Sequence, residues 1–168
     1  MTQTTNAADA TQTVQITIAP VRKSLRVHAS CARAFEVFTS GLGRWWPTNH
    51  GIGNKPMKAA AMETRLGGRW YEVSEDGSEV TIGRIIIWEP PHCFVMSWDI
   101  NSHWKPDTTV SSEVEVKFIA EGPSTTRVEL EHRKFEQMGT EAGEKMRRDV
   151  DGGWPTLLEM FKREAEAS

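Results

Sequence analysis

The sequence predicts an α+β domain in which an antiparallel sheet curls around a C-terminal helix. Two observations carry this prediction. Segments that alternate apolar and polar residues follow one another from residue 58 to residue 134, and short turns join them, which makes neighbouring strands antiparallel. An amphipathic helical segment follows these strands, so one face of the sheet can be covered while the other stays in water.

The composition is that of one ordinary globular domain. The chain has 168 residues, of which 38% are hydrophobic and 26% charged, enough to bury a single sizeable core. With a net charge of -3 it lacks the basic surface that nucleic-acid binding requires. Its longest apolar run falls far short of the roughly 18 residues that span a membrane. We therefore expect no nucleic-acid partner and no membrane partner.

The first residues are polar, with neither a basic start nor an apolar run of the kind found in signal peptides. We predict a disordered polar tail at 1–13, one domain at 14–168 and a cytoplasmic location. Cys31 and Cys93 lie far apart and outside any C-x-x-C spacing, which is typical of reduced thiols.

The first predicted elements are an edge strand over residues 14–27, which Pro20 interrupts, and two short helices after it. Ser30 can cap the first of these helices, in which apolar residues recur at spacings of three and four. Gly41 and Gly43 are expected to end it.

Turn signals divide the middle of the chain into strands. Gly67-Gly68, a Glu-Asp-Gly-Ser segment, a Pro-Pro pair and a Gly-Pro segment separate them. With the edge strand they make a sheet of about six to seven strands, the others being predicted at 58–66, 69–74, 80–88, 93–100, 111–120 and 125–134.

The C-terminal segment contains both helix-forming and helix-breaking signals. We expect Gly152-Gly153 to break a charged helix that begins near Thr140, and Pro155 to occupy the first turn of a second helix. This second helix has the apolar stripe that should cover the sheet, formed by Trp154, Leu157, Leu158, Phe161 and Ala165.

Several motifs in this order resemble the activator-of-Hsp90-ATPase-like family of the START/Bet v 1 (SRPBCC) superfamily. They are AFEVFTSGLGRWWP, ETRLGGRWYE, GRIIIWEPP, FVMSW, TRVELEHRKFE and GGW, and they span most of the chain. The resemblance implies a helix-grip fold: a curved sheet wrapped around the long C-terminal helix, with a cavity for apolar molecules between them. In that family Trp45-Trp46 and the loop with His50 would lie at the entrance of the pocket.

A cavity of this kind needs large apolar walls and a few polar groups that orient a ligand, and indole and phenol side chains supply both. Each tryptophan is explained equally well as part of the core. The residues expected to line the pocket are Trp45, Trp46, His50, Tyr71, Ile85, Ile87, Met96, Trp98, Val116, Phe118, Leu130, His132, Trp154 and Leu158.

Catalytic signals are few. His132 shares the covered face of its predicted strand with Leu130, where a neutral imidazole could act on a ligand, although a hydrogen-bonded core histidine fits the same pattern. Glu63 is a second candidate, but an ion pair with Arg65 explains it equally well. The five histidines show no metal-ligand spacing and no glycine-rich segment fits a phosphate loop, so we expect no metal and no cofactor.

Three functions remain open. The first is binding of a small hydrophobic or aromatic ligand in the pocket. The second is an enzyme of cyclase, dehydratase or hydrolase type that uses the same pocket. The third, regulation of an Hsp90-type chaperone, is not favoured, because the established activators of that family use an additional N-terminal domain where this sequence has a short polar stretch. Whether the chain forms a homodimer is also left open.

Overall fold

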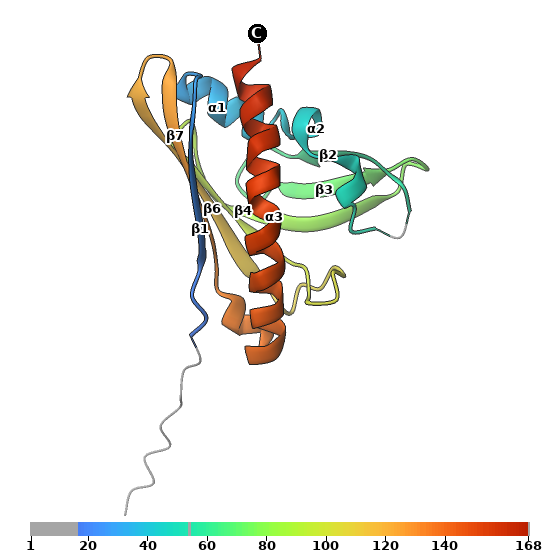
Figure 1. The fold of residues 1–168 in the computed structure, drawn as a ribbon. Helices are drawn as coiled ribbons and strands as arrows, with labels where there is room; N and C mark the ends of the chain where they lie inside the picture. Colours follow the sequence, from blue (N-terminus) through green and yellow to red (C-terminus); the bar gives the residue numbers. More distant parts are fainter. Residues whose placement is uncertain (1–16, 54, 168) are drawn as a thin grey trace, which may run out of the picture.

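The computed structural model describes residues 17–53 and 55–167, which fold into one curved seven-stranded sheet with a long helix against one side (Figure 1). The predicted polar tail at 1–13 and the beginning of the predicted first strand, at 14–16, lie outside the described residues. The α+β helix-grip architecture expected from the sequence is confirmed.

The sheet is antiparallel throughout, in the order β1-β7-β6-β5-β4-β3-β2. β1 is an edge strand, as predicted. The strands are β1 (Val21–Val27), β2 (Met57–Met62), β3 (Arg69–Ser74), β4 (Glu79–Glu89), β5 (Cys93–Trp98), β6 (Ser112–Gly122) and β7 (Thr125–Arg133).

β2 ends four residues earlier than predicted, because the chain turns sharply before β3. The amide of Gly68 donates to the carbonyl of Arg65 at 2.9 Å, and Gly67 has a φ of 76°. A Cβ atom on Gly68 would collide with the carbonyl oxygen of Glu63, so the turn requires glycine there. The predicted strand residues 63–66 belong to this turn.

Alternation along the strands places the core on the side that faces the long helix. In β6, Val114, Val116 and Phe118 are buried, and in β7 Val128 and Leu130 are buried beside them. The residues between them are mostly charged and form ion pairs across neighbouring strands, such as Arg133 with Glu113 at 3.2 Å. One face of the sheet is therefore wet and the other covered, as the sequence indicated.

Two short helices follow β1. α1 (Cys31–Phe38) is capped by the Ser30 side chain, which accepts a hydrogen bond from the amide of Arg33 at 3.2 Å. α2 (Leu42–Trp45) comes directly after it, and a single 3-10 turn, η1 (Thr48–His50), leads into β2. A second 3-10 turn, η2 (Phe135–Met138), joins β7 to the last helix.

That last helix, α3 (Thr140–Glu166), is continuous, so the predicted break at Gly152-Gly153 is wrong. Pro155 stands inside the helix. Mid-helix proline costs about 3 kcal/mol and each glycine about 1 kcal/mol relative to alanine. The buried stripe extends over the whole helix, and the apolar area it removes from water outweighs these local costs. Its members are Met146, Val150, Trp154, Leu157, Leu158, Phe161 and Ala165.

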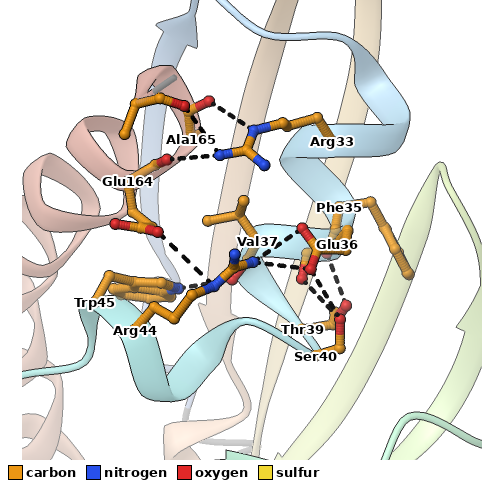
Figure 2. Close-up of polar contacts among 11 residues, drawn as sticks. Arg33, Phe35, Glu36, Val37, Thr39, Ser40, Arg44, Trp45, Glu164 and Ala165 are labelled. Atoms are coloured by element: carbon orange, nitrogen blue, oxygen red, sulfur yellow. Dashed lines mark hydrogen bonds and ion pairs between the residues drawn. The ribbon is translucent and has the colours of Figure 1, made fainter.

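The C-terminal end of α3 is held by α1 and α2 (Figure 2). The guanidinium of Arg33 donates to the carbonyl oxygens of Ala165 and Glu164, both at 3.3 Å. Arg44 lies between Glu36, at 2.8 Å, and Glu164, at 3.8 Å. A positive charge at a helix C-terminus stabilises its terminal carbonyl groups, so Arg33 of α1 adds to the backbone bond from the amide of Ala167 to the carbonyl of Glu164.

Within the described ranges, no helix combines the length and the apolar character needed to cross a membrane.

Replacing Phe161 with alanine should lower the free energy of unfolding by about 3 to 5 kcal/mol, because a fully buried aromatic ring leaves a cavity when removed. Its ring packs against Phe38 and Trp45, with centroids 4.9 and 5.6 Å apart. Glu159→Ala, exposed on the same helix, is the control. Denaturant midpoints give the comparison, and a Phe161→Ala midpoint equal to that of the control would contradict the packing described.

Candidate functional site

A recess of about 80 Å³ lies beside the middle of α3, facing the end of β5 and two loops. Four of the seven tryptophans of the chain form its walls. The full lining is Trp46, His50, Ile52, Trp98, Trp104, Asp149, Val150, Gly153, Trp154 and Leu157. We call this space the inner recess.

The adjacent tryptophans after α1 have different roles. Trp45 is buried, and its indole N–H donates to the carbonyl of Val37 at 2.9 Å, so it fixes α2 to α1 (Figure 2). Trp46 continues past the helix and packs edge to face against Trp70 and Trp154, with centroids 4.8 and 6.2 Å away. Pro47 ends the helix here, which lets Trp46 reach the inner recess.

The wall formed by α3 is fixed by a buried hydrogen bond. The indole N–H of Trp154 donates to Nδ1 of His132 at 3.2 Å. Since that nitrogen accepts, the neutral ring carries its proton on Nε2, which donates to Oγ of Ser112 at 2.9 Å. Burial lowers the pKa of His132 to about 3, so the ring is neutral over the whole physiological range.

Trp98 has a buried donor without an acceptor. Its side chain is 4% exposed, and Nε1 has no hydrogen-bond partner among the described residues. Its ring lies between Trp70, Trp104 and Trp154, with centroids 5.8, 6.2 and 6.1 Å away. A buried N–H without an acceptor costs about 1 to 3 kcal/mol, so such groups are rare in folded proteins.

Trp104 closes the inner recess from the loop after β5. Its φ is 58°, a left-handed conformation that is strained for a bulky residue. The Asn101 side chain enforces this turn, because its Oδ1 accepts from the amides of His103 at 3.0 Å and Lys105 at 3.1 Å. The indole N–H of Trp104 then donates to Oδ2 of Asp149 on α3 at 3.0 Å.

Asp149 also binds Lys145, one turn earlier on α3, at 2.8 Å. The ammonium group of Lys145 lowers the pKa of the Asp149 carboxyl, so it is ionised. Lys145 in turn donates to the carbonyl of Ser102 at 2.8 Å. The loop of Trp104 is thus attached to α3 by two polar contacts.

The opposite loop is held by a buried carboxylate. Glu72 on β3 accepts hydrogen bonds from the amides of Ile52, at 2.8 Å, and Gly53, at 3.4 Å. Burial raises the pKa of Glu72, and these two amide bonds act in the opposite direction. Glu72 therefore positions the loop that brings His50 and Ile52 to the inner recess.

Outside the inner recess lies a larger open space of about 540 Å³, which we call the vestibule. Its lining is more polar and includes both loops: His50, Gly51, Ile52, Gly53, His103, Trp104, Lys105, Asp149 and Gly153.

The residues expected to line a pocket fall into three groups. Trp46, His50, Trp98 and Trp154 line the inner recess. A second group is buried in the core around it without lining it: Trp45, Ile85, Met96, Val116, Phe118, Leu130, His132 and Leu158.

Tyr71 and Ile87 form the third group, which lies away from the inner recess. Tyr71 alternates with buried Trp70, and its ring lies under the guanidinium of Arg69, 4.3 Å from the ring centroid. Ile87 is 42% exposed. The β4 ladder shifts register between Ile85 and Ile87, so these two residues do not share a face as simple alternation requires.

Six lining residues were not predicted: Ile52, Trp104, Asp149, Val150, Gly153 and Leu157. The helical spacing contained a signal for some of them, because Asp149, Val150, Gly153, Trp154 and Leu157 recur at three and four residues on one face. Trp104 had only a weak signal, an aromatic residue in an otherwise polar loop.

Neither predicted catalytic candidate has the environment of an acid or base that meets a ligand. Both ring nitrogens of His132 are hydrogen-bonded inside the core. Glu63 lies at the turn before β3, where the backbone amide of Arg69 donates to it at 2.9 Å and lowers its pKa together with the Arg69 guanidinium. In the described ranges, no three His, Cys, Asp or Glu residues gather closely enough to hold a metal ion.

The fold and sequence are similar to those of known proteins. Residues 28–166 match the family model described as Activator of Hsp90 ATPase homolog 1-like protein. The structure of an anthrahydroquino-gamma-pyrone synthase, Txn09, complexed with SUM is 42% identical, with a TM-score of 0.62 over 88% of this chain and 97% of that one.

A second similar structure is that of CalC from Micromonospora echinospora, a self-sacrificing resistance protein. It is 35% identical, with a TM-score of 0.62 over 87% of this chain and 93% of that one. CalU16 from the same organism, at 22% identity and a TM-score of 0.55 over 89% of this chain and 76% of that one, shares the fold. The comparison with curated protein sequences found no match.

The neutral state of His132 predicts an acid-sensitive fold. The unfolded chain binds a proton at His132 near its ordinary pKa of 6.5, whereas the native state resists protonation until about pH 3. Stability is therefore fully present above pH 6.5 and is lost as the pH falls from there towards 3. This group contributes a slope of at most about 1.4 kcal/mol per pH unit.

Denaturant unfolding at a series of pH values tests this. His132→Gln should show a shallower loss of stability between pH 6.5 and 5 than the wild type, whatever its absolute stability. His28→Gln, which removes one imidazole at an exposed position, is the matched control. Equal slopes in all three proteins would show that His132 is not a buried neutral group.

Proposed function

Because the chain belongs to the activator of Hsp90 ATPase homolog 1-like family of the START/Bet v 1 superfamily, we propose that it binds a small apolar or aromatic molecule beside α3. The observation that carries this proposal is the tryptophan-walled inner recess, with an unpaired indole N–H at Trp98. Flat aromatic rings pack well against such edge-to-face indoles.

Gly153 supports the same proposal. A glycine inside a helix costs about 1 kcal/mol relative to alanine, so it normally has a packing or functional reason. Packing does not require this one, since a Cβ atom there would meet nothing within 4 Å. Because Gly153 has no side chain, the inner recess stays open at this position.

The similar proteins support the aromatic character of the ligand. The name of the 42% identical synthase refers to a molecule with anthrahydroquinone and pyrone rings, which is a flat aromatic system. The 35% identical protein is described as a resistance protein, which is compatible with binding a small molecule.

We expect 1,8-dihydroxyanthraquinone, a flat aromatic probe with carbonyl acceptors, to quench tryptophan emission saturably and to raise the melting temperature. A ligand at 100 times its dissociation constant stabilises the native state by about 2.7 kcal/mol, since it binds that state only. An unchanged melting temperature and emission across this probe and simpler aromatic compounds would overturn the proposal.

A pair of glycine variants locates the binding. Gly153→Leu should weaken probe binding at least about tenfold by filling the inner recess, while helix propensity keeps the fold stable. Gly152→Leu is the matched control: a Cβ there also meets nothing within 4 Å, and Gly152 does not line the inner recess. Equal affinity in the two variants would place the ligand elsewhere.

A second candidate is an enzyme of cyclase or dehydratase type, which the similarity to a named synthase favours. In such an enzyme the inner recess would mainly fold and desolvate the substrate. Native mass spectrometry of the freshly purified protein would identify a co-purifying molecule. The protein is then incubated with an excess of that molecule. An enzyme converts it to an isomer or to a compound that has lost water, whereas a binding protein leaves it unchanged.

A further inference from the structure

The inner recess and the vestibule are neighbouring spaces. They share His50, Ile52, Trp104, Asp149 and Gly153 in their linings. The inner part, about 80 Å³, is smaller than the roughly 300 Å³ that drug-sized ligands need, whereas the outer part is about 540 Å³. A ligand that fills the inner recess must therefore extend into the vestibule or displace its wall.

The two parts differ in chemistry. Indoles and aliphatic side chains make up most of the inner recess, and the His50 imidazole and the Asp149 carboxylate line both spaces. The vestibule adds the polar side chains of His103 and Lys105. Within the described residues, both bonds to Asp149 end on Oδ2, which leaves Oδ1 able to accept another hydrogen bond. Asp149 stands at the boundary, since it lines both parts.

We propose, on the basis of the proposed function, that the ligand is amphipathic, with an aromatic part in the inner recess and a neutral, hydroxyl-bearing part in the vestibule that Asp149 recognises. A carboxylate accepts hydrogen bonds from hydroxyl groups and disfavours a second negative charge nearby. The imidazoles can donate to or accept from the same hydroxyl groups. A polyol or glycosyl group has the hydroxyl groups that this recognition requires.

Three probes separate the contributions of the aromatic part and the polar part to the affinity: 2-naphthol, 2-naphthyl β-D-glucopyranoside and 2-naphthyl sulfate. Isothermal titration calorimetry should find the glucoside bound about tenfold more tightly than 2-naphthol, the gain expected from one hydrogen bond to a charged group. The sulfate should bind no better than 2-naphthol. Methyl β-D-glucopyranoside, which has no aromatic part, should not bind detectably.

Asp149→Asn should remove most of the preference for the glucoside, measured as the ratio of the glucoside affinity to the 2-naphthol affinity in the same variant. The amide can still accept from Trp104, so the wall is kept, but the charge is lost. Asp151→Asn is the matched control, because Asp151 pairs with Lys23 at 2.8 Å and lines neither space. It should keep the wild-type preference.

Each outcome has a separate meaning. If the glucoside and 2-naphthol bind with equal affinity, or if 2-naphthyl sulfate binds more tightly than 2-naphthol, the proposal of an amphipathic ligand is wrong. The proposal of an aromatic pocket would then still stand. A glucoside preference that survives Asp149→Asn would overturn the role of Asp149. If none of the naphthyl probes and no other aromatic compound binds, the proposed function fails, and this inference fails with it.

Discussion

The hydrogen bond between the indole of Trp154 and Nδ1 of His132 fixes the rotation of α3 on the sheet. A helix turned by one residue, about 100°, would break this bond and leave Nδ1 of His132 unpaired in the core, at a cost of about 1 to 3 kcal/mol. It would also carry Gly153 and Asp149 away from the two loops that they face. The position of every α3 residue at the inner recess therefore depends on a histidine that stays neutral.

Strands were predictable because their signal is local. A period of two identifies a half-buried strand wherever it occurs, and the predicted ranges for β3 and β7 agree with the structure to within one residue. The long helix shows the opposite case. Gly152, Gly153 and Pro155 are local breaking signals, but the burial of the stripe around them is a property of the whole sheet and overrides them.

The family resemblance predicted Trp46 and His50 at the site, and the period of regular elements predicted others. Trp98 and Trp154 follow from the period of their strand and helix. One of the neighbours Trp70 and Tyr71 must face outward, and only pairing with adjacent strands decides which. A register shift moves Ile87 out of the predicted face. Trp104 depends on a left-handed backbone turn that the Asn101 side chain stabilises, and a sequence pattern contains no sign of that geometry.

Contacts between indoles run through the molecule as a chain. Trp45 contacts Trp46, which contacts Trp70 and Trp154, and Trp98 joins both of these to Trp104, with successive centroids between 4.8 and 6.2 Å apart. The seventh tryptophan, Trp88, packs against Phe35 instead. At such separations excitation energy passes between neighbouring rings, so these six indoles form one coupled group of fluorophores. Tryptophan fluorescence from this protein therefore reports on the whole cluster. An energy acceptor bound beside any one ring quenches the emission of its neighbours as well.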